Sequence, residues 1–136
     1  MDDCLFCKIV KGEIPANKIY EDNNFLVFLD INPGSKGHSL LIPKNHETNL
    51  LNEKDDLGTK MLIVIKKVCK ALKQSLGAEG FNIVSNINSV AGQEVFHTHI
   101  HIIPRYDPNE MSFWDPKKTE GEELVLLTEK IIKELE

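Results

Sequence analysis

The feature that most constrains this chain is an alternation of histidine with mostly apolar residues in the run His97-Thr98-His99-Ile100-His101-Ile102-Ile103. Side chains two residues apart point to nearly opposite sides of a helix, but in a strand they share one face and lie about 6.5–7 Å apart. The β-branched residues favour the strand. The pattern predicts a strand over residues 94–103, ended by Pro104, with three imidazoles on one face and a core-facing side made of Phe96, Thr98, Ile100 and Ile102.

Three imidazoles on one face of a strand allow two kinds of chemistry. Neutral rings bind metal ions, and in phosphoryl chemistry one ring acts as nucleophile while another holds an anionic oxygen. Three exposed polar residues on a half-buried strand are a weaker interpretation, because histidine is uncommon and its alternation with apolar residues rarely arises by chance. The polar loop 86–93 directly upstream contains Gly92 and can turn backbone N–H groups toward an anion.

Two segments have the apolar spacing of helices. The longer one is expected to begin with Asn52 as N-cap and Asp55 as a first-turn acid, and to be followed by Gly77. A second helix is predicted over residues 122–135. Its apolar positions are Leu124, Leu127, Ile131 and Leu135, and those of the longer helix are Leu57, Met61, Ile65, Val68, Leu72 and Leu76.

Four shorter runs complete the expected elements. Residues 18–21 and 25–29 flank a polar turn and predict a hairpin, and further strands are predicted at 38–42 and 81–86. The order of strands and helices has no regular βαβ alternation. We therefore predict a single α+β domain over residues 1–136, with an antiparallel sheet and helices on one side of it.

The charge balance limits the possible partners. Sixteen Lys and Arg against 21 Asp and Glu give the 136 residues a net charge of −5. A general grip on nucleic acid needs a basic face, so we expect no nucleic-acid partner. No apolar run approaches the roughly 20 residues that span a bilayer, and the acidic start lacks the basic beginning and apolar core of a signal peptide. We therefore expect a cytoplasmic protein without a membrane partner.

Cys4 and Cys7 form a separate motif near the N-terminus. Their spacing lets both sulfurs reach one metal ion. A thioredoxin-type redox pair would need a preceding strand, which position 4 cannot supply. The spacing alone leaves two interpretations open, a pair of metal ligands or two reduced, half-buried thiols.

Together these segments resemble the histidine-triad (HIT) superfamily, whose signature is His-φ-His-φ-His-φ-φ with φ an apolar residue. Residues 91–96 resemble the Gly-Gln element before the triad, and the similarity covers residues 4–105, most closely the Hint-like, nucleoside-phosphoramidase branch. Three positions depart from the pattern: Thr98 replaces an apolar residue, Asn88 a frequent glycine, and Glu94 a frequent Ser or Thr near the phosphate. The N-terminal half is similar in Phe6-x-x-Ile9, Gly12-x-Ile14-Pro15, Phe28-x-Asp30-Ile31 and Gly37-His38-x-Leu40-x-Ile42-Pro43.

The resemblance implies a five-stranded antiparallel sheet with a long central helix and a C-terminal helix, and a homodimer whose sheets join. It also implies cleavage at the α-phosphorus of purine nucleoside phosphoramidates through a nucleotidyl-histidine, without a catalytic metal. A neutral imidazole is a good nucleophile near pH 7, which agrees with the match of His99 to the nucleophile. A carboxylate at Glu94 would repel an anionic substrate unless it points away or is protonated.

The resemblance also implies roles for individual residues. The implied catalytic residues are His99, His101, Gln93 and His38. Without the resemblance, Phe28 and Ile31 would be plain core, Asp30 a turn residue, and His38 a buried, satisfied histidine. The implied nucleotide contacts are Phe6, Ile9, Phe28, Asp30, Ile31, Asn86, Gln93, Val95, His99 and His101.

Some HIT proteins bind zinc through an N-terminal cysteine pair, with the first triad histidine as the last ligand. By this resemblance Cys4, Cys7, His46 and His97 would form a structural zinc site. Ligation would hold the N-terminus against the histidine strand and fix the orientation of His97.

Two other functions stay open from the sequence. Dinucleoside polyphosphate hydrolysis would use the same residues with a different leaving group. A nucleotide- or zinc-binding adaptor with little turnover would act through partner proteins instead.

Overall fold

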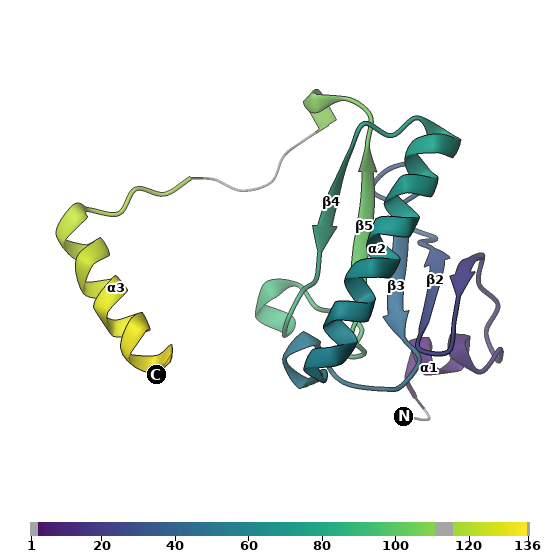
Figure 1. Ribbon diagram of the computed structural model, residues 1–136, viewed down its shortest axis with the longest axis horizontal. Coiled ribbons are helices and arrows are strands. Elements are labelled where there is room, and N and C mark those ends of the chain that lie inside the picture. The colour runs from purple at the N-terminus through teal and green to yellow at the C-terminus, as the bar shows by residue number, and fades with distance from the viewer. Residues whose placement is uncertain (1–2, 111–115, 136) are drawn as a thin grey trace.

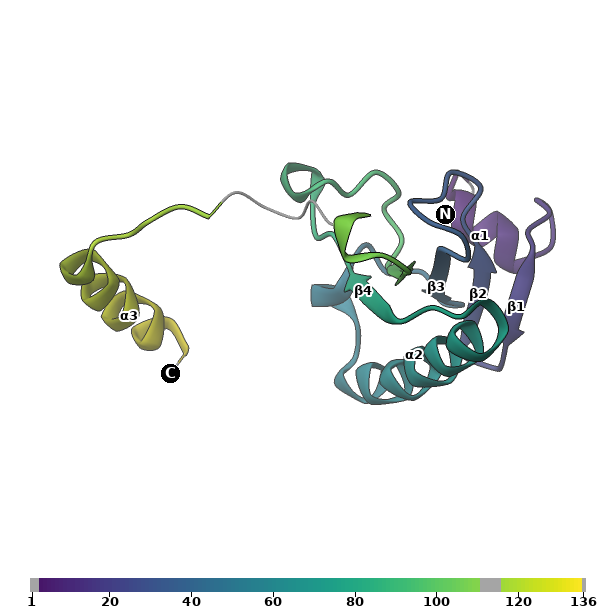
Figure 2. The same ribbon diagram turned by 90° about the horizontal axis from the view of Figure 1, so that it is seen from above.

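The computed structural model describes residues 3–110 and 116–135. It contains a five-stranded antiparallel sheet with the strand order β1-β2-β3-β5-β4. Figures 1 and 2 show the long helix α2 across one face of this sheet and the short helix α1 on the other. The strands are β1 (Lys18–Glu21), β2 (Phe25–Leu29), β3 (Ser39–Pro43), β4 (Gly80–Val84) and β5 (Ile100–Arg105), and the helices are α1 (Leu5–Val10), α2 (Asp55–Leu76) and α3 (Gly121–Leu135).

Both faces of the sheet are apolar. Neighbouring residues of a strand point to opposite faces, so a run of consecutive apolar residues contributes to both. The predicted five-stranded sheet with a central and a C-terminal helix is confirmed, but the expectation of helices on one side is wrong, because α1 covers the second face. The core under α2 contains Phe25, Val27, Leu41, Ile100 and Ile102 packed against Met61, Val64, Val68 and Leu72. The core under α1 contains Leu26, Phe28, Leu40 and Ile42 packed against Phe6 and Ile9.

The predicted hairpin is confirmed and is closed by one aspartate. Asp22 Oδ1 accepts hydrogen bonds from the backbone N–H groups of Asn24 and Phe25, each at 2.7 Å. Its other oxygen, Oδ2, accepts from the Tyr20 hydroxyl at 2.7 Å. A single carboxylate therefore accepts hydrogen bonds from the backbone and side-chain donors of the turn between β1 and β2, as short polar side chains in turns commonly do.

The ends of α2 follow the sequence only in part. Asp55 lies in the first turn, as predicted, but the N-cap is Lys54, and Asn52 belongs to a preceding 3₁₀ turn. Gly77 ends the helix in the left-handed region with φ of 75°, as expected for a glycine after a helix. Near this end, Gly37 has φ of 90°, and a Cβ placed on it would lie 2.8 Å from Leu76 Cδ1. Glycine therefore lets the loop before β3 pass closely beneath α2.

The histidine segment is shorter as a strand than predicted. Regular pairing begins only at Ile100 and continues through Pro104 to Arg105, so Pro104 does not end the strand. Pro104 pairs with Phe81 of β4 beyond the last residue that pairs with β3, a position where a strand tolerates proline. Phe96, predicted to face the core, is 47% exposed.

Helix α3 is present where the sequence predicts it, and its side chains are exposed throughout. It lies apart from the sheet in both ribbon views (Figures 1 and 2). Within the part of the chain that is described, no helix combines the length and the apolar character needed to cross a membrane.

Candidate active site and metal site

A cavity of about 440 Å³ opens beside the last histidines of the triad. Three segments enclose it: α1, the end of β2 with the residues that follow it, and the connection between β4 and β5. Of the residues predicted to contact a nucleotide, only Gln93 does not line this cavity. Those that do are Phe6, Ile9, Phe28, Asp30, Ile31, Asn86, Val95, His99 and His101.

One hydrogen bond determines the tautomer of His99. Its Nδ1 lies 2.8 Å from the backbone oxygen of His97. A carbonyl oxygen only accepts hydrogen bonds, so Nδ1 carries the proton and the neutral ring keeps a lone pair on Nε2. The ring is 7% exposed and packs edge-on against Phe6, with ring centroids 5.1 Å apart. The arrangement gives a buried, oriented imidazole with a nucleophilic nitrogen in a residue that lines the cavity.

A second chain of hydrogen bonds orients His101. The backbone N–H of Gly34 donates to His38 Nδ1 at 2.8 Å, so the proton of the neutral His38 ring is on Nε2. His38 Nε2 lies 3.0 Å from His101 Nδ1 and donates to it. The His101 proton is therefore on Nε2, where it can donate to an oxygen in the cavity. His38 therefore lies beside the triad, and its hydrogen bond goes to His101 and not to His99.

Both rings of this pair are neutral near pH 7. Burial lowers the pKa of His38, and the nearby Asp30 opposes this only in part. Burial, followed by the positive charge that His99 and His38 can carry, lowers the pKa of His101 to about 4. Asp30 Oδ2 is 3.6 Å from His38 Nε2, so the carboxylate lies beside the pair.

Gln93 supports the loop instead of facing the cavity. Its side-chain oxygen accepts from the Asn88 N–H at 2.8 Å, and its amide nitrogen donates to the backbone oxygens of Thr48 at 2.7 Å and Val95 at 3.1 Å. The backbone N–H of Gln93 donates to the Asn88 oxygen at 3.1 Å. With 3% exposure, Gln93 is a positioning residue for the segment that precedes the histidines.

Two of the three departures from the HIT pattern have local explanations. Asn88 has φ of 72°, a left-handed conformation that favours glycine and that asparagine tolerates better than most residues. Thr98 is 1% exposed, and its N–H and hydroxyl both donate to the Glu47 oxygen, at 2.9 and 3.4 Å. A hydroxyl is therefore satisfied in this buried position.

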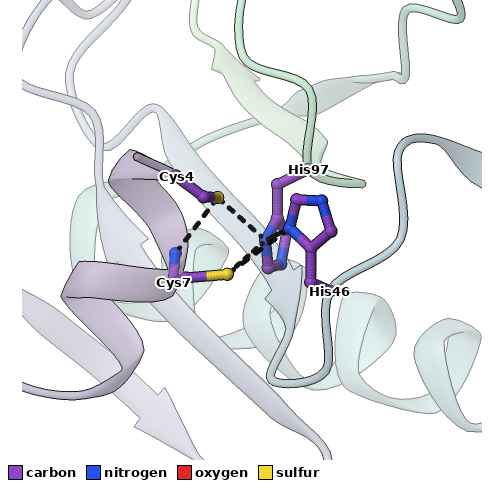
Figure 3. A group of neighbouring side chains, drawn as sticks. All are labelled: Cys4, Cys7, His46 and His97. Carbon is purple, nitrogen blue, oxygen red and sulfur yellow. Dashed lines mark hydrogen bonds between the residues drawn. The ribbon is translucent and has the colours of Figure 1, made fainter. Parts of the chain in front are cut away.

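Figure 3 shows the second cluster, in which Cys4, Cys7, His46 and His97 converge. His97 Nδ1 lies 3.4 Å from Cys4 Sγ, 3.6 Å from Cys7 Sγ and 3.2 Å from His46 Nδ1, and Cys7 Sγ lies 3.4 Å from His46 Nδ1. Zinc–ligand bonds of tetrahedral sites place neighbouring ligand atoms about 3.3–3.8 Å apart. The four residues can therefore hold one metal ion.

The surroundings of the cluster suit a closed metal site. His97 Nε2 donates to the Pro43 oxygen at 2.8 Å, which leaves the Nδ1 lone pair directed at the cluster. Burial and the adjacent Cys4 sulfur raise the pKa of the Cys7 thiol, and a bound divalent cation would offset that cost. Cys4 Sγ also accepts from the Cys7 N–H at 3.3 Å, so the first ligand caps α1.

Three comparisons with known proteins agree with this geometry. The HIT domain family matches residues 11–108. The chain is 47% identical over 107 residues to the adenosine 5′-monophosphoramidase hnt1 of Schizosaccharomyces pombe, covering 79% of this chain and 76% of that protein. The crystal structure of SMU.412c from Streptococcus mutans has a TM-score of 0.92 at 42% identity, covering 100% of this chain and 87% of the other. A Zn-bound histidine triad family protein from Mycobacterium smegmatis has a TM-score of 0.78 at 38% identity and covers 99% of both chains.

The neutral state of His101 predicts how stability depends on pH. Because the folded pKa of about 4 lies below the unfolded value of 6.5, the unfolded chain takes up this proton first as the pH falls. Stability is therefore complete above pH 6.5 and declines toward pH 4, by up to about 1.4 kcal/mol per pH unit for one proton. Urea unfolding between pH 7.5 and 4.5 should show a shallower decline for His101→Gln than for the unaltered protein. Equal slopes would contradict a neutral, half-buried His101.

Proposed function

The chain belongs to the HIT domain family, and on that premise we propose that it hydrolyses purine nucleoside phosphoramidates through a nucleotidyl-histidine on His99. The observation that supports this most is the position of the His99 ring, which lines a cavity of about 440 Å³ with its Nε2 lone pair available. The 47% identity to an adenosine 5′-monophosphoramidase supports the same substrate class.

The nucleoside would occupy the part of the cavity made by α1 and the end of β2. Phe6 and Phe28 offer aromatic surfaces to a flat base, and Ile9 and Ile31 add apolar contacts. Ile31 is 84% exposed, so a bound base would bury a side chain that is otherwise in water. Asp30 lines the same wall, and its carboxylate suits the paired hydroxyls of a ribose.

The reaction would proceed in two displacements at phosphorus. His99 Nε2 attacks the phosphorus in line, the P–N bond breaks, and the departing amine takes a proton from solvent. Nδ1 stays bonded to the His97 oxygen, which stabilises the positive charge of the phosphorylated ring. Water then attacks the same phosphorus, releases the nucleoside monophosphate and returns the proton to solvent, which restores neutral His99.

The oxygens of the phosphoryl group need donors at the same place. His101 Nε2–H is oriented for this by the His38 bond, and its low pKa keeps the ring neutral during the reaction. Asn86 lines the cavity nearby, and the backbone N–H of Val95 is a further candidate, whereas that of Gln93 already donates to Asn88. Donors arranged before reaction stabilise the charge that develops in the transition state.

The other two functions fit the cavity less well. Its ionisable lining residues are Asp30, Glu94, His99 and His101, with no lysine or arginine among the described ones. A dinucleoside polyphosphate would bring several negative charges next to two carboxylates. An adaptor would use the pocket only for binding. The free lone pair on His99 Nε2 would then take part in no reaction.

We propose further that Cys4, Cys7, His46 and His97 hold a structural zinc ion; a histidine triad family protein of similar fold is Zn-bound. Zinc would supply no chemistry at phosphorus. It would tie α1, which carries Phe6, to the segment that carries His99. The family resemblance implies a homodimer whose sheets join. Strand β4 lies at an edge of the sheet, where Ile83 is 46% exposed, and this edge fits such a dimer. The cytoplasmic location stays a prediction.

Replacing the nucleophile tests the proposed reaction. His99→Ala should lower kcat for adenosine 5′-phosphoramidate by about a thousand-fold or more, because the variant lacks the ring proposed to form the covalent intermediate. A coupled assay of adenosine monophosphate release measures this, and circular dichroism checks that the variant is folded. Near-normal turnover by His99→Ala would contradict the assignment.

The zinc proposal is tested by metal analysis of the purified protein. We expect one zinc per chain, loss of zinc in Cys7→Ser, and a lower melting temperature for that variant and for the chelator-treated protein. Cys69→Ser is the matched control, because Cys69 packs beside the α2 core away from the cluster and its replacement should keep the metal. Absence of stoichiometric zinc, together with melting unchanged by chelator, would contradict the site.

A further inference from the structure

Glu94 brings a carboxylate into the proposed active site that the reaction described above does not use. It lies in the connection between β4 and β5 and lines the same cavity as His99 and His101. Its side chain is exposed, and among the ion pairs of residues 3–110 and 116–135 it takes part in none. The carboxylate is therefore available to a ligand.

The position of Glu94 separates it from the nucleoside end of the cavity. The groups that suit a base and a ribose come from α1 and the end of β2, whereas Asn86, Gly92 and Glu94 form the wall from the β4–β5 connection. Asn86 and Gly92 are neighbours in that wall, since a Cβ on Gly92 would lie 3.6 Å from Asn86 Nδ2. When the phosphorus lies at His99 and the nucleoside occupies its own end of the cavity, the leaving group on phosphorus is the part of the substrate that lies against this wall.

The charges of the cavity favour one kind of substituent there. No lysine or arginine belongs to its described lining, so no cation of the described cavity wall neutralises Glu94. Charges interact more strongly in a partly enclosed site than in bulk water, because the effective dielectric constant is lower. A negative substituent is repelled by Glu94, and a positive one is attracted.

We propose that Glu94 forms a leaving-group subsite for a cation, so that the preferred substrates are nucleoside phosphoramidates whose departing amine carries a second, protonated amino group. The inference rests on the proposed function and specifies its leaving group. The phosphoramidate of a diamine has this chemistry: His99 displaces one nitrogen from phosphorus, that nitrogen takes a proton from solvent, and the other nitrogen stays as the ammonium group that Glu94 holds. Glu94 selects the substrate and takes no part in proton transfer.

The test compares three adenosine 5′-phosphoramidates of matched length, made from 1,4-diaminobutane, n-pentylamine and 4-aminobutanoate. We expect kcat/KM to fall in the order cationic, neutral, anionic, by about two- to five-fold at each step, as for a partly exposed ion pair. The differences should shrink in high salt. Glu94→Gln should bring the three values together, and Glu94→Lys should reverse their order.

Glu79→Gln is the matched control, because it makes the same charge change at an exposed position on the turn between α2 and β4. It should keep the order of the unaltered protein. Equal values for the three substrates, or an order unchanged in Glu94→Gln, would overturn the subsite while leaving the hydrolase proposal intact. If the protein hydrolyses none of the three substrates and does not hydrolyse the unsubstituted phosphoramidate, the proposed function itself is contradicted, and the subsite with it.

Discussion

The His97 residue joins the two sites of this protein through three contacts. Its Nδ1 faces both cysteine sulfurs and His46, its Nε2 donates to the Pro43 oxygen, and its own backbone oxygen accepts from His99 Nδ1. The ring that completes the proposed metal cluster thus belongs to the same residue whose carbonyl determines the tautomer of His99, the proposed nucleophile. A shift of His97 would disturb the proposed metal ligands and the His99 lone pair together, which gives a physical reason for a structural metal beside the proposed reaction.

Five histidine rings lie in two neighbouring groups. The His46 and His97 ring centroids are 5.0 Å apart, and the His101 centroid is 5.2 Å from both His38 and His99. Several charged imidazoles at this spacing, removed from water, would be costly. Burial lowers the pKa of His38, His97 and His101, which favours their neutral forms. Three rings also have a backbone partner: the Pro43 oxygen for His97, the His97 oxygen for His99 and the Gly34 N–H for His38. For His101, the neutral form also keeps the N–H that its proposed role requires.

The sequence predicted the five strands and the two longer helices, and most of the predicted nucleotide contacts line one cavity. It did not predict the interactions that place these residues. The alternation around His99 predicted which rings lie together, yet it did not predict that pairing starts at Ile100, because the Thr98 N–H donates to Glu47 in a loop instead of to a neighbouring strand. The role of Gln93 was missed for the same reason, since it depends on where Thr48 lies in space. Helix α1 was missed because six residues are too few for a periodic pattern, although Phe6 and Ile9 have helical spacing.

Covalent capture of the intermediate tests the central claim most directly, namely that His99 attacks phosphorus. The protein would be mixed in excess with adenosine 5′-phosphoramidate, quenched in alkali within one turnover, and digested for mass spectrometry, since phosphorylated histidine survives in base. The account predicts an adenylyl group on His99 that forms and decays at rates matching turnover. Normal turnover with inversion of configuration at phosphorus and without an adduct, or an adduct on another residue, would contradict it.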